Sequence, residues 1–229
     1  MAILSLALYG SRARRDEDED SDIDLFAISD DSEYRMIIEG NTNIASYPRP
    51  LAFERAENGD LFMLHIVSES RALYDPRGDL INLKREFKFR SNYDAEIQFA
   101  SDIAWMLVDH AHTSDNFSFI NRRIAWCVRT ILIARAANLR LPIFSAKDLA
   151  EFSGSELTLP LIKSKGCIGP RTESIEELKA FIGRFGKKMP ARQDSLSLHD
   201  YAHIFAESKN VMGNKTLLML QSTAEDFYA

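Results

Sequence analysis

Two short motifs near the N-terminus carry residue types that could bind phosphate and a metal ion. Gly10-Ser11 ends one apolar run, and after ten intervening residues Asp22-Ile23-Asp24 opens another. Gly10 has no Cβ, so its backbone can approach a ligand closely, and Ser11 and the amides after it can face a phosphate. Alternate residues of a strand share a face, so the two aspartates point the same way. Their carboxylates repel each other unless a divalent cation lies between them, and Mg²⁺ prefers such hard oxygen ligands together with substrate phosphates.

The residues around these motifs predict a mixed α/β arrangement that would position them. Short apolar runs closed by glycine or proline are typical of buried strands, whereas apolar residues at helical spacing predict helices. Strands are predicted by these criteria at 3–9, 24–28, 43–47 and 73–76. Helices are predicted at 32–39 and over 51–66, the second with an interruption at Asn58-Gly59.

From residue 92 onward the hydrophobic pattern is helical. Amphipathic helices are predicted at 97–108, 120–132, 146–152, 175–185 and 216–228. Ser174 and Glu177 have the spacing of a capping box that opens the helix at 175–185. Because the pattern changes near residue 90, we predict two domains, 1–90 and 91–229.

Composition excludes several classes of protein. Hydrophobic residues make up 45% and charged residues 27% of the 229, as in ordinary globular chains and unlike disordered ones. The formal net charge of −6 argues against a polybasic nucleic-acid-binding chain. The two cysteines, Cys127 and Cys167, form no metal or redox motif, which fits a reducing compartment. Arg129 and Arg135 interrupt the most apolar helical stretch, so we expect a cytoplasmic protein without membrane association.

The arrangement Gly10-Ser11, ten residues, Asp22-Ile23-Asp24 closely resembles the nucleotidyltransferases of the DNA polymerase β superfamily, particularly the minimal bacterial type. The resemblance covers residues 3–30 and extends to about residue 75. With the patterns above, it implies an α/β (α+β) nucleotidyltransferase domain with a mixed sheet, followed by an all-α helical-bundle domain.

The resemblance also implies a role for each motif residue. Gly10 and Ser11 would hold the β and γ phosphates of a nucleoside triphosphate, with ATP the expected one. Asp22 and Asp24 would bind the Mg²⁺ that aligns an acceptor hydroxyl with the α-phosphate, and pyrophosphate would leave. Such catalysis consists mainly of positioning and charge neutralisation. The candidates for further nucleotide contacts are Arg12, Arg14 and Arg15.

One residue departs from the family pattern. Family members usually carry a third carboxylate on the next strand, and here Asn43 takes that position. An amide can offer an oxygen to a metal, but it cannot accept a proton, and the missing charge weakens the binding of a second metal. Glu54 and Glu69 are the candidates to replace this carboxylate. The departure favours nucleotide binding over full turnover.

Three functions follow from these residues. The first is transfer of AMP from ATP to a hydroxyl of an acceptor protein or RNA, which includes antitoxin-type enzymes that adenylylate a toxin. The second is an aminoglycoside-type small-molecule nucleotidyltransferase, which needs an acidic pocket for a polycation. The third, motivated by Asn43, is a catalytically weakened module that binds a nucleotide or a partner protein.

The helical half is similar to the helical domains of kanamycin-type nucleotidyltransferases and to HEPN domains. HEPN ribonucleases use an arginine and a histidine separated by four to six residues, and Arg192 and His199 have six residues between them. Pro190 and the Ser195-Leu196-Ser197 stretch argue against a rigid catalytic helix there. A homodimer through the helical domain stays open at this point.

Overall fold

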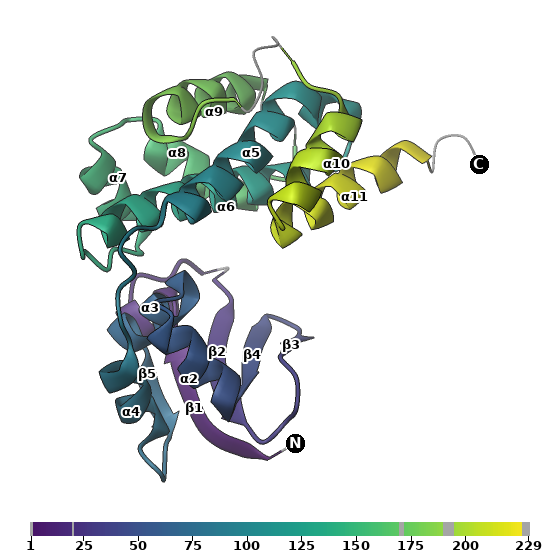
Figure 1. Ribbon diagram of the computed structural model, residues 1–229. Coiled ribbons are helices and arrows are strands. Elements are labelled where there is room, and N and C mark those ends of the chain that lie inside the picture. The colour runs from purple at the N-terminus through teal and green to yellow at the C-terminus, as the bar shows by residue number, and fades with distance from the viewer. Residues whose placement is uncertain (1, 20, 170–171, 190–194, 226–229) are drawn as a thin grey trace. The chain divides into compact units, whose positions relative to one another are not determined.

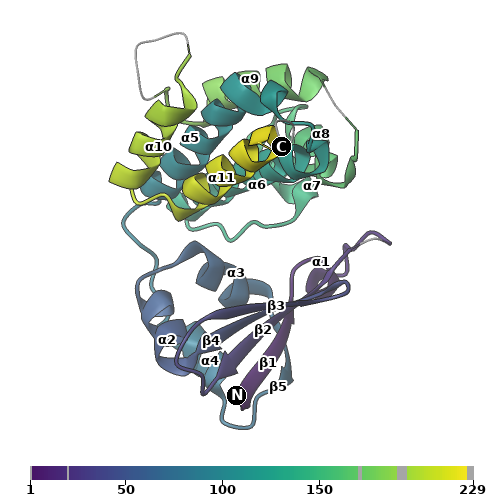
Figure 2. The same ribbon diagram turned by 90° about the vertical axis from the view of Figure 1, so that its right-hand side faces the viewer.

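The computed structural model describes residues 2–19, 21–169, 172–189 and 195–225. The chain divides into two compact units (Figures 1 and 2). The first comprises Met1–Asn92 together with Ala137–Ser145, and the second comprises Tyr93–Ala136 together with Ala146–Ala229. The segment 137–145 therefore returns to the first unit between two parts of the second.

The first unit is built on a five-stranded mixed sheet with the order β3-β4-β2-β1-β5. Its strands are β1 (Ile3–Tyr9), β2 (Ile23–Ser29), β3 (Arg35–Glu39), β4 (Thr42–Pro48) and β5 (Arg71–Tyr74). β2 and β4 run parallel, whereas the β1–β2, β1–β5 and β3–β4 pairs are antiparallel. The predicted mixed sheet is confirmed.

The predicted helix at 32–39 is wrong, because residues 35–39 form strand β3. β3 pairs with β4 as a hairpin in which Glu39 lies opposite Thr42, across the two residues Gly40 and Asn41. Gly40 has a φ of 59°, which suits a tight hairpin turn. Ladder hydrogen bonds to β4 thus decide the conformation of an apolar run whose spacing fits a helix or a strand.

Three helices cover one face of this sheet (Figure 1). They are α2 (Arg49–Glu57), α3 (Leu61–Glu69) and α4 (Asp79–Glu86), and the short α1 (Ser11–Arg14) follows β1. The break between α2 and α3 falls at the predicted Asn58-Gly59, and the Asp60 side chain then accepts hydrogen bonds from the amides of Phe62 and Met63. Alternate strand residues such as Phe26 and Tyr47 meet these helices in the core.

In the described part of the second unit, all secondary structure is helical. Its helices are α5 (Asp94–His110), η1 (Ala111–Thr113), α6 (Phe117–Asn138), α7 (Ala146–Ser153), α8 (Thr158–Lys163), η2 (Ser164–Gly166), α9 (Thr172–Phe185), α10 (Leu198–Glu207) and α11 (Val211–Glu225). The α6 helix extends by its last two residues, Ala137 and Asn138, into the first unit. In the described part of the chain, no helix is long and apolar enough to cross a membrane.

The predicted capping box is wrong. Helix α9 begins at Thr172, so Ser174 lies inside the helix, where its hydroxyl is buried. The spacing of a capping box recurs at Ser197 and Asp200, and there both reciprocal hydrogen bonds form at the start of α10. The spacing alone does not locate a helix start, because it also occurs within a helical turn.

Candidate functional site

Asp24 lies in the middle of a row of three side chains that crosses the sheet. In register, Asp24 of β2 is opposite Tyr9 of β1 and opposite Asn43 of β4. Register partners point to the same face, and this row shares the helix-covered face with Phe26. The Nδ2 atom of Asn43 donates a hydrogen bond to Oδ1 of Asp24 over 3.3 Å. Asp22 is exposed and comes directly before β2, two residues from Asp24.

The two halves of the sequence motif meet at Gly10 and Asp24. A Cβ placed on Gly10 would lie 2.9 Å from Oδ2 of Asp24, closer than real Cβ atoms approach a neighbour. Gly10 also has φ 77° and ψ −155°, a backbone conformation that glycine alone adopts readily. The sequence therefore needs glycine here for two reasons, the backbone angles and the contact with the aspartate.

The turn after Gly10 is closed by its own backbone. The carbonyl of Gly10 accepts hydrogen bonds from the amides of Ala13 and Arg14 at 3.1 and 3.2 Å. The carbonyl of Ser11 accepts one from the amide of Asp16 at 3.1 Å. Ser11 is half-buried at the start of α1, and its phosphate contact stays a prediction.

Arg12 contacts the backbone that leads into β2. Its Nη2 and Nε atoms donate to the carbonyl of Ser21 at 2.8 and 3.2 Å, and Nε also lies 3.3 Å from the carbonyl of Asp22. These bonds connect helix α1 to the residues that carry the two aspartates. A phosphate contact of Arg12 stays a prediction, and the observed contacts give it a role in holding Asp22 in place.

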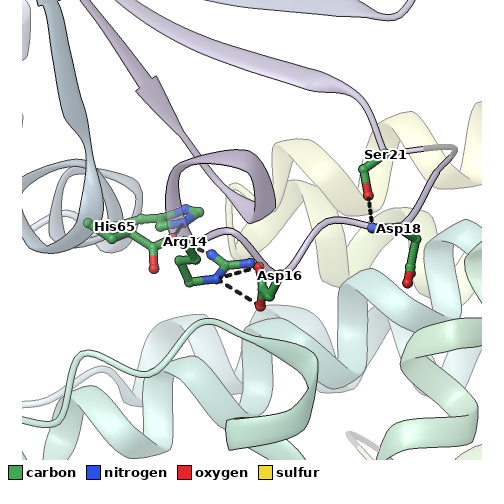
Figure 3. Close-up of polar contacts among 6 residues, drawn as sticks. Arg14, Asp16, Asp18, Ser21 and His65 are labelled. Atoms are coloured by element: carbon green, nitrogen blue, oxygen red, sulfur yellow. Dashed lines mark hydrogen bonds and ion pairs between the residues drawn. The ribbon is translucent and has the colours of Figure 1, made fainter.

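The other two arginines of α1 differ from each other. Arg14 is paired with Asp16 and with Glu69 of α3, as Figure 3 shows for Asp16. Arg15 is exposed and has a φ of 65° at the end of the helix. Of the predicted phosphate contacts, Arg15 is therefore the one directed to solvent.

Neither glutamate candidate for a third carboxylate lies in the row with Asp24. Glu54 is exposed on α2, and the carboxylate of Glu69 is engaged by Arg14 and His65. Within the described ranges, no three or more His, Cys, Asp or Glu residues are grouped so that they could hold a metal. The row therefore supplies one carboxylate and one amide, with Asp22 as the second carboxylate beside it.

This donor set fits Mg²⁺ that is shared with a phosphorylated ligand. Asp22 and Asp24 offer hard oxygen atoms, and Mg²⁺ in proteins is commonly bound by one or two carboxylates plus substrate phosphates. Asn43 can turn its amide to offer an oxygen in place of Nδ2. The residues present are thus sufficient for a metal that arrives with a nucleotide.

Tyr9 of the row and Tyr47 of β4 are both neutral. Burial raises the pKa of Tyr9, and the negative charge of Asp24 raises it further. Burial likewise raises the pKa of Tyr47, which the nearby Arg55 guanidinium partly counters. Neither phenol is therefore a candidate base at neutral pH.

Three exposed apolar side chains lie on or directly before β3, and the sequence patterns do not predict them as site residues. They are Tyr34, Met36 and Ile38, with exposed fractions of 41%, 48% and 70%. Ile38 is the register partner of Asn43, so it continues the row at the edge of the sheet. The available signal in the sequence is Gly40-Asn41 between two apolar runs, which is typical of a hairpin.

The predicted nuclease pair cannot be assembled from the described residues, because Arg192 lies outside them. His199 is on α10, where its Nε2 atom is 3.1 Å from Nε2 of His203. In the same unit, His110 contacts the carbonyl of Leu196 through Nε2 at 2.6 Å. His199 and His110 therefore each have a structural partner within the helical unit, His203 and the carbonyl of Leu196.

Comparison with known proteins gives a family match for the first part of the chain. Residues 1–78 match the family model described as polymerase beta, nucleotidyltransferase. Among solved structures, the nucleotidyltransferase-like protein from Exiguobacterium sibiricum 255-15 is 12% identical, with a TM-score of 0.33. That match covers 79% of this chain and 69% of the other. No curated protein matches the sequence.

Proposed function

We propose that this chain, whose first 78 residues are a nucleotidyltransferase domain of the polymerase β superfamily, transfers AMP from ATP to a hydroxyl group of an acceptor protein. One observation carries the proposal. Gly10 lies against Asp24, and Asp24 lies between Tyr9 and Asn43 with Asp22 two residues away. A phosphate held at Gly10 would therefore be next to the carboxylates.

Each residue has a defined task in this reaction. Gly10 and Ser11 bind the β and γ phosphates, and Asp22 and Asp24 hold Mg²⁺. When bound, the metal neutralises phosphate charge and so favours attack at the α-phosphorus. The acceptor oxygen forms a bond to that phosphorus as the bond to the β-phosphate oxygen breaks, and pyrophosphate leaves. The hydroxyl proton passes to water, because the amide of Asn43 cannot accept it.

Two surface features favour a protein acceptor over RNA. The loop between α1 and β2 exposes four carboxylates, at Asp16, Glu17, Asp18 and Glu19, which would repel a polyanion. The exposed apolar side chains Met36 and Ile38 offer contact area to a polypeptide on the side of Asn43. An antitoxin-type enzyme, whose acceptor is a toxin protein, belongs to this class.

An aminoglycoside-type reaction is the second candidate. The same four exposed carboxylates suit a polycationic small molecule, which is the observation in its favour. The two candidates share the nucleotide site and differ in the acceptor. The test incubates the chain with α-labelled ATP and either an aminoglycoside or a cell lysate. Transfer of the label to the small molecule supports the aminoglycoside-type reaction, and transfer to a protein band supports the protein acceptor.

The deciding experiment is a calorimetric titration of ATP with and without Mg²⁺. The native chain is compared with an Asp22→Ala/Asp24→Ala variant, and an Asp18→Ala/Glu19→Ala variant serves as the control that removes the same charge from the exposed loop. We expect Mg²⁺-dependent binding in the native chain and the control and none in the first variant. If ATP, GTP, CTP and UTP all fail to bind the native chain, the proposal is wrong and partner binding becomes the leading function.

A further inference from the structure

Helix α3 contacts the chain on both sides of the Gly10-Ser11 turn. Before the turn, the Tyr9 ring meets the His65 ring edge-on, with 5.3 Å between ring centroids. After the turn, Nη1 of Arg14 lies 2.5 Å from Oε1 of Glu69. His65 and Glu69 are four residues apart on α3, so both contacts come from one face of that helix.

Glu69 joins the two contacts into one cluster. Its Oε1 atom is shared by Arg14 and by Nε2 of His65, and all three side chains are at least four-fifths buried, with exposed fractions of 14–19%. Figure 3 shows the His65 and Arg14 side chains lying beside each other, with Arg14 also reaching Asp16. Charge-assisted bonds that are shielded from water are stronger than those on an open surface.

The side chain of Arg14 is coupled to the backbone that would hold phosphate. Its amide donates to the carbonyl of Gly10, and its guanidinium binds both carboxylate oxygens of Asp16 at 3.1 and 3.2 Å. The amide of Asp16 in turn donates to the carbonyl of Ser11. A displacement of Arg14 would therefore move the carbonyls of both Gly10 and Ser11.

A residue from the distant segment 137–145 completes the cluster. The Phe144 ring stacks on the His65 ring, with centroids 4.3 Å apart and an angle of 16° between the planes. Phe144 is 3% exposed. Its segment, 137–145, connects α6 to α7 and belongs to the same unit as His65.

We infer that Glu69 is a positioning residue for nucleotide binding, acting with His65 and Phe144. Through Arg14 it fixes the Gly10-Ser11 turn beside Asp24. The inferred effect on nucleotide binding rests on the proposed function, whereas the geometry rests on the contacts of Glu69, Arg14, His65 and Phe144 described above. It also gives Glu69 a role other than the metal ligand that its residue type suggests.

The test compares Glu69→Gln with the native chain in two binding measurements. ATP affinity is measured with saturating Mg²⁺, and the affinity for Mn²⁺ alone is measured by electron paramagnetic resonance. We expect the Kd for ATP to rise about tenfold, which is the loss of about one charge-assisted hydrogen bond. The Kd for Mn²⁺ should stay unchanged, because Asp24 lies on β2 and Arg12 holds the backbone of Asp22. A purely structural role would not separate the two affinities.

Matched variants show which residues are needed for ATP affinity. Glu57→Gln removes an exposed glutamate from the end of α2 and should leave both affinities unchanged. Phe144→Ala should weaken ATP binding as Glu69→Gln does, whereas Leu141→Ala, at a side chain of the same segment that is 44% exposed, should not. Arg14→Ala and Glu69→Gln should be non-additive when combined, since both break the same contact.

Amide hydrogen exchange of the ligand-free chain separates this inference from the proposed function. Glu69→Gln should speed exchange in a peptide that spans residues 10–16 and leave β2 unchanged. If exchange in that peptide is the same in both proteins, the positioning role is wrong whatever the chain binds. If exchange changes but the native chain binds no nucleotide, the cluster does fix the turn and the proposed function is the part that fails.

Discussion

Asn43 lies directly across from Asp24 in the parallel pairing of β4 with β2, and its Nδ2 atom is 3.3 Å from Oδ1 of Asp24. The amide thus donates to the carboxylate in the place where a third carboxylate would repel it. This contact stabilises Asp24 when no cation is bound. It also leaves the site with less negative charge to attract one.

The first prediction concerns that missing charge. Asn43→Asp should tighten Mn²⁺ binding by about tenfold, because a carboxylate a few ångströms from Asp24 adds a strong attraction for a dication. The measurement is a titration of Mn²⁺ followed by electron paramagnetic resonance, which also gives the number of ions per chain. Asn58→Asp places the same charge at an exposed residue at the end of α2, which is not part of the row. Equal affinities in the two variants would show that Asn43 does not face the metal.

Arg12 gives the second prediction. Arg12→Ala removes the hydrogen bonds to the carbonyls of Ser21 and Asp22, so Asp22 should lose its fixed position. We expect Mn²⁺ binding to weaken several-fold and the free energy of unfolding to fall by about 1 kcal/mol. Urea denaturation measures the second effect. Arg77→Ala, at an exposed residue before α4, should change neither quantity, and a similar loss there would point to general electrostatics.

The sequence predicts the two strands beside Gly10, Asp22 and Asp24, but it does not predict strand β3 or the contacts of Glu69. Gly10 could be placed after one strand, and Asp22 and Asp24 at the start of the next, because their spacing reflects one local turn and one strand. Hydrophobic spacing alone does not predict strand β3, because the conformation of Met36 to Ile38 depends on hydrogen bonds to β4. The role of Glu69 depends on a long-range contact, because its partner Arg14 is fifty-five residues away in sequence. Local sequence patterns do not predict such a contact.

The third prediction uses a carboxylate buried in the helical unit. Asp102 of α5 is 2% exposed, and burial raises its pKa to about 6, although a hydrogen bond from Gln98 lowers it. The folded chain therefore binds a proton that the unfolded chain, with a pKa of 3.8, has already released. Stability should fall as the pH rises from about 4 to about 6 and stay lower above that range.

Asp102→Asn keeps the shape and the acceptor for Gln98 but removes this titration. The variant should be more stable than the native chain at pH 8, by up to about 3 kcal/mol, and the difference should shrink towards pH 4. Thermal unfolding at a series of pH values measures it. Asp115→Asn changes an exposed aspartate of the same unit and should follow the native curve. A native curve parallel to that of Asp102→Asn would mean that Asp102 titrates normally.

The last prediction compares two glycines with positive φ. Gly10→Ala would force a Cβ to within 2.9 Å of Asp24 Oδ2 at backbone angles of 77° and −155°, whereas a Cβ on Gly40 meets nothing within 4 Å. Gly10→Ala should therefore lower the free energy of unfolding by about 2–4 kcal/mol, and Gly40→Ala by about 1 kcal/mol. Urea denaturation measures both.

The affinity for Mn²⁺ should also differ between the two glycine variants. Because the added methyl group displaces the Asp24 carboxylate, Gly10→Ala should also weaken Mn²⁺ binding in protein that is still folded. Gly40→Ala should bind Mn²⁺ as the native chain does, since its strain stays in the β3–β4 turn. Native Mn²⁺ affinity in folded Gly10→Ala would contradict the close approach of Gly10 to Asp24 on which the candidate site depends.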